Sequence, residues 1–337
     1  MGAIGQRCVP ETIAFVFENR HVNIRGGCVY IYRYSNNNIV INDLFIIPDK
    51  CNIYTFADDT CIVFSHDDNE HLHAVANEKL MKIAEWFCSN SLQLNTSKTK
   101  CMFFNLRGES AHNQIVLHDL KYHCYTQSCN CGYIEDVSYH TYLGVNVGVN
   151  VGDKNVNWNK HISSLINKLR FSLVLLYKIS QVASPRLCKM IYFNHIQSHL
   201  QYAIAAWGSI YKTALIPLQV IQKKAIRIVY NKPLDYPTSE LFLDANALQL
   251  RRLYAYRIIM LFVRGNIDLS IERCRSNRVQ CTYVSGSIAC TTRATMSIRY
   301  HLPKLLNVIR YGESVVISKD ELRSKLFDCD VEALLRQ

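Results

Sequence analysis

The sequence has no run of about 18 consecutive apolar residues, which is the length that a helix needs to span the hydrocarbon core of a membrane. No long apolar stretch of the kind found in secretory signals follows Met1 and Gly2. We therefore expect no membrane span and no secretion, and an intracellular location that is either nuclear or cytoplasmic. The 14 cysteines are accordingly expected to be reduced thiols rather than a disulfide framework.

Several motifs of nucleotide and acyl chemistry are also missing. The chain contains no Walker loop and no G-x-G-x-x-G segment, which argues against a P-loop nucleotidase and a dinucleotide-binding fold. It also has no G-x-S-x-G elbow to support a Ser-His-Asp triad.

A His- and Cys-rich segment is a candidate zinc site. Its candidate ligands are His118, His123, Cys124, Cys129, Cys131 and His140. The C-x4-C-x-C spacing matches no standard zinc knuckle, and Cys131 follows Cys129 too closely for easy tetrahedral ligation. We expect no zinc here, and the role of the Cys124–Cys131 region stays open.

Acidic residues are scarce in one part of the chain. Residues 159–262 hold 14 Lys or Arg against only Asp235, Glu240 and Asp244, so they carry the whole net charge of +11. A face of one charge sign favours contact with the phosphates of nucleic acid, and a merely solubilising surface is the alternative. The residues predicted to make such contacts are Lys223, Lys224, Arg227, Arg251 and Arg252.

Residues 52–65 predict a β-hairpin, because two runs rich in β-branched and aromatic residues flank a short polar turn. Asp58 and Asp59 lie at its tip. Two adjacent carboxylates repel each other unless a cation offsets their charge, and Mg2+ suits carboxylate ligands. The simpler alternative is an Asp-rich turn without a metal.

The sequence around this turn resembles reverse transcriptases. Residues 56–60 read F-A-D-D-T, similar to the Tyr/Phe-Ala-Asp-Asp box, with the Thr found in non-LTR retrotransposons. Four further segments resemble that family in its order, namely N-R-H-V-N-I-R-G at 19–26, I-N-D-L at 41–44, W…N-S-L-Q-L-N-T-S-K-T at 86–99 and Y-L-G-V…W-N-K-H-I at 142–162. Together they cover about half of the chain and indicate a non-LTR retrotransposon reverse transcriptase.

The resemblance implies an RNA-directed DNA polymerase, a nucleotidyltransferase of transposable elements that uses two magnesium ions. It assigns Asp58 as a metal carboxylate with Asp59 beside it. It also assigns Lys98 as a proton donor to the leaving pyrophosphate, the alternative being an exposed lysine at a helix end. The implied partners are an RNA template and a DNA primer, with no membrane, and no protein partner is predictable.

The resemblance further implies contacts to the primer. Phe56 would lie next to the primer terminus. Tyr142, Leu143 and Gly144 would belong to a hairpin that grips the primer. In fold terms, we expect an α+β protein that contains part of a palm, an antiparallel sheet with a packed helix, followed by an all-helical region like the thumb.

The sequence also departs from the family pattern. The other metal-binding Asp should lie on a strand upstream of residue 19, yet Asp43 is the first Asp and the earlier acids, Glu11 and Glu18, fall in no such motif. A Gly-Val-Pro-Gln-Gly segment expected between Gly27 and Ile41 is missing as well. We therefore expect a truncated copy, inactive alone, with magnesium binding in doubt. The alternatives are a non-catalytic nucleic-acid-binding protein and a translated remnant without a retained task.

Four regions are expected along the chain: a degenerate palm remnant at 1–50, a palm portion at 51–158, a basic thumb-like region at 159–262 and a loop-rich tail with short helices at 263–337. Strands are expected at 12–17 and 98–104, with Asp67 to Asn69 capping the helix between the hairpin and the second of these. Residues 266–300 read as loop. Three apolar stripes predict helices, formed by Leu72, Ala76, Leu80, Ile83 and Phe87, by Ile162, Leu165, Leu169, Leu173 and Leu176, and by Leu215, Leu218, Ile221, Ala225 and Ile228.

Overall fold

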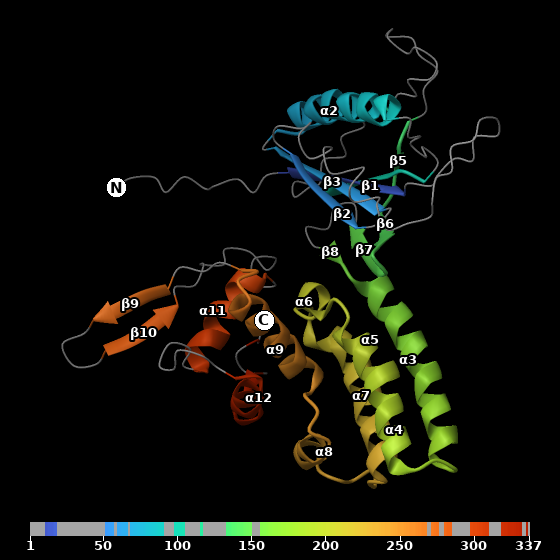
Figure 1. Cartoon of the computed structure of the whole chain (residues 1–337), viewed down its shortest axis with the longest axis vertical. Helices are drawn as coiled ribbons and strands as arrows, with labels where there is room; N and C mark the ends of the chain where they lie inside the picture. The colour runs from blue at the N-terminus through green and yellow to red at the C-terminus, as the bar shows by residue number, and fades with distance from the viewer. Residues whose placement is uncertain are drawn as a thin grey trace. The chain divides into compact units, whose positions relative to one another are not determined.

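The computed structural model shows an α+β protein that divides into two compact units, residues 1–157 and 158–337 (Figure 1). The residues that it describes are 11–18, 51–56, 59–66, 68–90, 98–104, 115–116, 133–149, 156–267, 271–275, 280–284, 297–309, 318–331 and 335. The Gly27–Ile41 segment lies outside these residues.

The first unit is built on a five-stranded sheet with the order β2-β3-β1-β4-β5. The strands are β1 (Glu11–Glu18), β2 (Cys51–Phe56), β3 (Asp59–His66), β4 (Lys100–Phe104) and β5 (Glu135–Asp136). All neighbours run antiparallel except β4 and β5. The strands predicted at 12–17 and 98–104 are thus confirmed, and β1 lies in the middle of the sheet between β3 and β4.

One long helix, α2 (Asn69–Ser89), packs on this sheet, as Figure 1 shows. Its first turn is capped by Asp68, whose Oδ2 accepts a hydrogen bond from the backbone N–H of His71 at 2.9 Å. All five residues of the predicted apolar stripe of α2 are buried. They meet Ile62 and Phe64 of β3 in a common core, so the stripe orients the helix on the sheet.

A smaller three-stranded sheet follows, with the order β6-β7-β8. It consists of β6 (Tyr139–Tyr142), β7 (Val145–Val149) and β8 (Val156–Asn157). Leu143 and Gly144 connect β6 to β7, with φ angles of 47° and 74°. Two consecutive positive φ values are typical of a two-residue type I′ hairpin turn, and leucine is an unusual residue for the first of these positions.

The second unit is helical around one large core. Its first helices are α3 (Asn159–Ser180), α4 (Pro185–Ile191), the π-helix η3 (Tyr192–Gln197), α5 (Ser198–Gln201), α6 (Ile204–Trp207) and α7 (Lys212–Tyr230). α3 and α7 lie side by side. Both predicted stripes face the core, where all members are buried except Leu173 and Ile228, which are half-buried.

The chain continues through α8 (Thr238–Asp244), α9 (Leu250–Val263), α11 (Ile298–Val308) and α12 (Lys319–Asp328). The helices α11 and α12 pack on α9, and their leucines join the same core as α3 and α7. A β-hairpin of β9 (Ile271–Arg275) and β10 (Gln280–Val284) corrects the prediction of loop over residues 266–300. Polar and apolar residues do not alternate regularly along this hairpin. Its sequence therefore lacks the two-residue period that would predict strands.

Candidate functional site

The β2–β3 hairpin positions the Asp-Asp motif. Phe56 ends β2, Asp59 begins β3, and the two are Cα partners in the antiparallel ladder. The Phe56 side chain is 65% exposed, whereas Asp59 is half-buried. Asp58 lies outside the described residues. The hairpin thus presents an exposed aromatic ring at the end where the metal carboxylates were predicted.

A further acidic residue lies beside this hairpin in the sheet. Glu18, the last residue of β1, is the Cα partner of Asp59 on the side of β3 opposite Phe56. Sequence reasoning predicted the strand but did not place it next to the hairpin. Its position follows from long-range pairing, which a local pattern does not encode. The central strand of the sheet therefore ends with a carboxylate residue in register with Asp59.

The β6–β7 hairpin carries a second predicted motif, Tyr142, Leu143 and Gly144. Burial raises the pKa of Tyr142 to about 12, and the negative charges of Cys61 and Asp59 contribute to the same shift. Tyr142 is half-buried at the end of β6, and Leu143 and Gly144 form the turn that follows it.

Lys98 precedes β4 by two residues and is half-buried. In the sheet order, β1 separates β4 from β3, which carries Asp59. The neighbouring Lys100 forms an ion pair with Glu135 of β5. The prediction that Lys98 donates a proton therefore stays a prediction.

The residues that the structure describes do not form a metal centre. No three His, Cys, Asp or Glu side chains among them are grouped as ligands. Mg2+ requires about six oxygen ligands, of which carboxylates usually supply one or two. Of the predicted pair only Asp59 is described, so the described residues do not fit the expected two-ion site. For the zinc candidates, His140 lies on β6 and the other five ligands fall outside the described residues.

The second unit contains a long stretch without acidic residues. No Asp or Glu occurs between residues 154 and 234, which include α3 to α7. The exposed basic residues of these helices are Lys160, Lys168, Arg170, Lys178, Arg186, Lys189, Lys212 and Lys224. We refer to α3–α7 as the acid-free helices. No acidic residue within these helices neutralises their positive charge. Such a surface favours association with polyanions.

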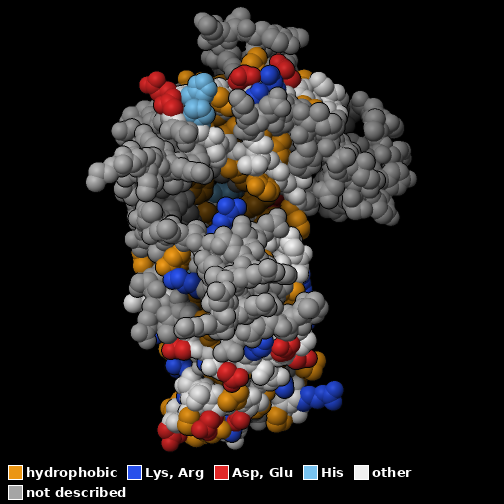
Figure 2. Space-filling model, turned by 90° about the vertical axis from the view of Figure 1, so that its left-hand side faces the viewer, with side chains coloured by type: hydrophobic (Ala, Val, Ile, Leu, Met, Phe, Trp, Pro, Cys, Tyr) orange, Lys and Arg blue, Asp and Glu red, His pale blue; other side chains and the backbone are white. Residues whose placement is uncertain are grey.

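Acidic side chains of this unit gather elsewhere. Those described lie on or beside α8 and α12. Figure 2 views the molecule from the side on which α12 and the β9–β10 hairpin lie in Figure 1, and the acidic side chains in its lower part are mixed with basic ones. Such a mixed surface is ordinary for a solvated protein. The imbalance of charge therefore belongs to the acid-free helices.

Exposed aromatic side chains accompany the basic ones on α3. Phe171 is 74% exposed and follows Arg170, and Tyr177 is 58% exposed and precedes Lys178. Aromatic rings next to cations offer stacking surfaces for bases beside contacts for phosphates. The charge of this helix is evident from the sequence. The exposure of its aromatic rings is known only from the structure, which shows which face of α3 is buried.

Lys223 and Lys224 of α7 fit the predicted basic face, because Lys224 is exposed and Lys223 is half-buried. Arg227 serves a local structural role, since its Nε and Nη2 donate to the carbonyl oxygens of Pro233 and Tyr236 at 3.2 and 3.1 Å. These bonds tie the end of α7 to the following loop. Arg227 therefore stabilises the fold at this position.

Of the two arginines at the start of α9 that were predicted to contact phosphate, Arg251 is buried, whereas the contact of Arg252 stays a prediction. Arg251 is only 4% exposed and donates from Nη2 to the carbonyl oxygen of Ile210 at 2.9 Å. Arg252 is half-buried and lies over the ring of Phe327 at 5.9 Å. The reason is that α9 is surrounded by other helices, so even its charged residues pack inward.

Among the described residues, no helix is both long and apolar enough to cross a membrane. The free thiols are those of Cys51, Cys61, Cys88, Cys101, Cys188 and Cys329. Comparisons of the chain with protein-family models, with curated proteins and with solved structures each give no match.

Proposed function

We propose that the chain is the C-terminal palm and thumb portion of a non-LTR retrotransposon reverse transcriptase. We further propose that this chain binds nucleic acid but does not synthesise DNA by itself. The observation that carries this proposal is the position of the F-A-D-D-T motif at the end of a β-hairpin, where Phe56 and Asp59 are Cα partners and the ring of Phe56 is 65% exposed. The resemblance assigns Phe56 to the primer terminus and Asp59 to the catalytic hairpin. An exposed aromatic ring beside the expected catalytic carboxylate is what a primer site requires.

The topology of the first unit supports the palm assignment. The hairpin with the F-A-D-D-T motif forms one edge of an antiparallel sheet, and a single amphipathic helix packs on that sheet. The exposed ring of Phe56 lies at the same end of the hairpin as Asp59. A bound primer end would stack against this exposed ring.

The proposal does not include catalysis by these residues alone. Nucleotidyl transfer needs carboxylates that hold two cations on both sides of the reacting phosphorus. Of the predicted metal carboxylates, the described residues include only Asp59, and they contain no group of three possible metal ligands. The other Asp motif of the family is not in the sequence. We expect no extension of a DNA primer on an RNA template when this chain is supplied with magnesium and nucleotides.

A second candidate function is a nucleic-acid-binding protein without any polymerase-like site. The acid-free helices with their exposed basic and aromatic residues favour it independently of the palm. The two candidates differ in one respect. Only the palm assignment gives the β2–β3 hairpin a role in recognising a primer terminus.

Binding to hybrids of an RNA template with a DNA primer separates these candidates. We expect the full chain to bind a hybrid with a recessed 3′ end more tightly than a blunt hybrid of equal length. Phe56→Ala should abolish this preference while leaving the affinity for the blunt hybrid unchanged. Tyr54→Ala is the matched control, because Tyr54 is an exposed aromatic residue on the same strand. Equal affinity of the unaltered chain for both hybrids would contradict the palm assignment and favour the second candidate.

A further inference from the structure

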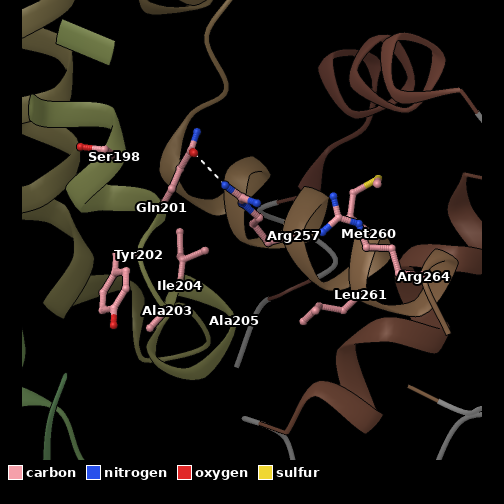
Figure 3. Close-up of a pocket in the computed structure, with 10 residues that line it drawn as sticks. All are labelled: Ser198, Gln201, Tyr202, Ala203, Ile204, Ala205, Arg257, Met260, Leu261 and Arg264. Atoms are coloured by element: carbon pink, nitrogen blue, oxygen red, sulfur yellow. Dashed lines mark hydrogen bonds between the residues drawn. The ribbon is translucent and has the colours of Figure 1, made fainter. Parts of the chain in front are cut away.

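A groove of about 380 Å3 lies between the α5–α6 segment and α9 in the second unit (Figure 3). Gln201 and Ile204 contribute to one wall, and Arg257, Met260, Leu261 and Arg264 contribute to the other. Its size is within the range of about 300–1,000 Å3 that is usual for small-ligand sites. None of these groove residues was singled out from the sequence.

The wall formed by α9 presents two arginines on one helix face. Arg257, Met260, Leu261 and Arg264 follow the spacing i, i+3, i+4 and i+7, so they form a single stripe. The two arginines stand at the ends of this stripe with the two apolar side chains between them. No Asp or Glu lines the groove among the described residues, so its charge is positive.

The guanidinium group of Arg257 is held in place by one hydrogen bond and has further N–H groups that can donate hydrogen bonds. Its Nη2 donates to Oε1 of Gln201 at 2.7 Å, the bond drawn in Figure 3. Its Nε is buried and has no hydrogen-bond partner among the described residues. A buried donor without a partner costs free energy. The bond to Gln201 also fixes the guanidinium plane before a ligand arrives.

The opposite wall has an unusual backbone. Ala203, which lines the groove, has a φ of 50°, in the left-handed region that non-glycine residues seldom adopt. The π-helix η3 ends six residues earlier, and π-helical turns are frequent at functional sites. Gly208 allows the bent segment to approach α9, since a Cβ there would come within 2.7 Å of Cδ2 of Tyr254. The surrounding fold therefore maintains this strained wall.

We propose that this groove binds a phosphate of single-stranded nucleic acid through Arg257 and Arg264, with the adjoining base against Met260 and Leu261. Guanidinium groups bind phosphate oxygens through paired, charge-assisted hydrogen bonds. Apolar side chains between the two arginines offer a surface for a base face. Tyr202, which also lines the groove, is 54% exposed. The inference rests on the proposed function only in taking nucleic acid as the partner.

The test uses the full chain and a fluorescent oligothymidylate of about 12 nucleotides, within the site sizes usual for single strands. Anisotropy gives the affinity at salt concentrations between about 50 and 200 mM. The variants are Arg257→Gln, Arg264→Gln and their combination, with Arg264→Lys as the conservative change. Lys319→Gln is the matched control, because Lys319 is an exposed cation on α12 that does not line the groove.

We expect the combined variant to bind about tenfold more weakly, the loss typical of one charge-assisted contact. The slope of log affinity against log salt should fall by about 0.7, the value for one phosphate contact of a single strand. Arg264→Lys should retain part of the affinity, and Lys319→Gln should bind like the unaltered chain. Binding of the combined variant that equals that of Lys319→Gln would overturn the inference.

Two further measurements, of melting temperature and of crosslinking, distinguish a failure of the groove proposal from a failure of the proposed function. If Arg257→Gln lowers the melting temperature, Arg264→Gln alone carries the test, since Arg264 is exposed at the end of α9. Photocrosslinking of a bromouracil-substituted strand should map to residues 198–205 or 257–264, and crosslinks confined to other segments would contradict the groove. Absence of any binding by the unaltered chain would overturn the proposed function as well. Binding lost in Lys223→Gln/Lys224→Gln but intact in the groove variants would overturn the groove alone.

Discussion

The hydroxyl group of Tyr254 and Nδ1 of His301 form a hydrogen bond of 2.9 Å that joins α9 to α11 inside the helical core. Both side chains are almost completely buried. Burial, followed by the positive charges of Arg251 and Lys304, lowers the pKa of His301 to about 4. The imidazole is therefore neutral in the folded protein near neutral pH.

This pair predicts a pH-dependent stability. The ordinary pKa of histidine is about 6.5, so between about pH 4 and 6.5 the unfolded state binds more protons than the folded state. The free energy of unfolding is then complete above this window and decreases as the pH falls through it, by about 2 kcal/mol at about pH 5. The drop in melting temperature between about pH 7.5 and 5 should be smaller for His301→Gln, which retains an acceptor for Tyr254. An unchanged drop would contradict the assignment.

Magnesium is expected to leave stability unchanged. A ligand that binds only the folded state raises the melting temperature by mass action, and the described residues form no group of metal ligands. Millimolar Mg2+ should therefore not shift the melting temperature of the full chain, and Asp59→Asn should leave stability equal or slightly higher because a repelling charge is removed. A stabilisation by Mg2+ that disappears in Asp59→Asn would show that a working metal site exists.

Gly208→Ala should destabilise the helical unit. The added Cβ would lie 2.5 Å from the carbonyl oxygen of Ile204 and 2.7 Å from Cδ2 of Tyr254, so α6 and α9 would have to separate. Overpacking of this kind costs about 1–3 kcal/mol. Denaturant unfolding measures the loss. The control is Gly265→Asn, because a Cβ at Gly265 meets nothing within 4 Å and asparagine tolerates its positive φ of 74°. Equal losses for both variants would contradict the close contact.

Leu143→Asn should stabilise the β6–β7 hairpin. A φ of 47° is unfavourable for leucine, and asparagine is preferred at the first position of a type I′ turn. The expected gain is about 0.5–1 kcal/mol, reduced by the loss of apolar contact at this half-buried position. Thermal unfolding measures it, with Leu175→Asn on α3 as a control at which no gain is expected. A stability loss at Leu143 as large as at Leu175 would argue against the strained turn.

Much of the local structure was predictable from the sequence. The stripe from Leu72 to Phe87 faces the core because its spacing follows the helical period, and the F-A-D-D-T segment lies at a hairpin because strand-forming runs flank it. The charge imbalance of residues 159–262 likewise needed only counting. Such features depend on residues that are close in the chain.

Features that depend on long-range packing were not predictable in this way. The pairing of Glu18 with Asp59 joins strands about 40 residues apart, and no local pattern specifies it. Arg251 reads as a surface cation because arginine is usually exposed, yet the helices around α9 bury it. The groove at Arg257 appears only when α5, α6 and α9 are brought together.

The central claim is that the acid-free helices bind the phosphates of nucleic acid, and the salt dependence of binding tests it most directly. For the full chain with an RNA–DNA hybrid, the affinity should fall steeply between about 50 and 200 mM salt. Lys223→Gln/Lys224→Gln should lower the slope of log affinity against log salt by about 0.7–1.8, while Lys82→Gln/Lys319→Gln, which removes two exposed charges elsewhere, should leave it unchanged. An affinity that stays constant over this salt range, or an equal change of slope in both double variants, would contradict the claim.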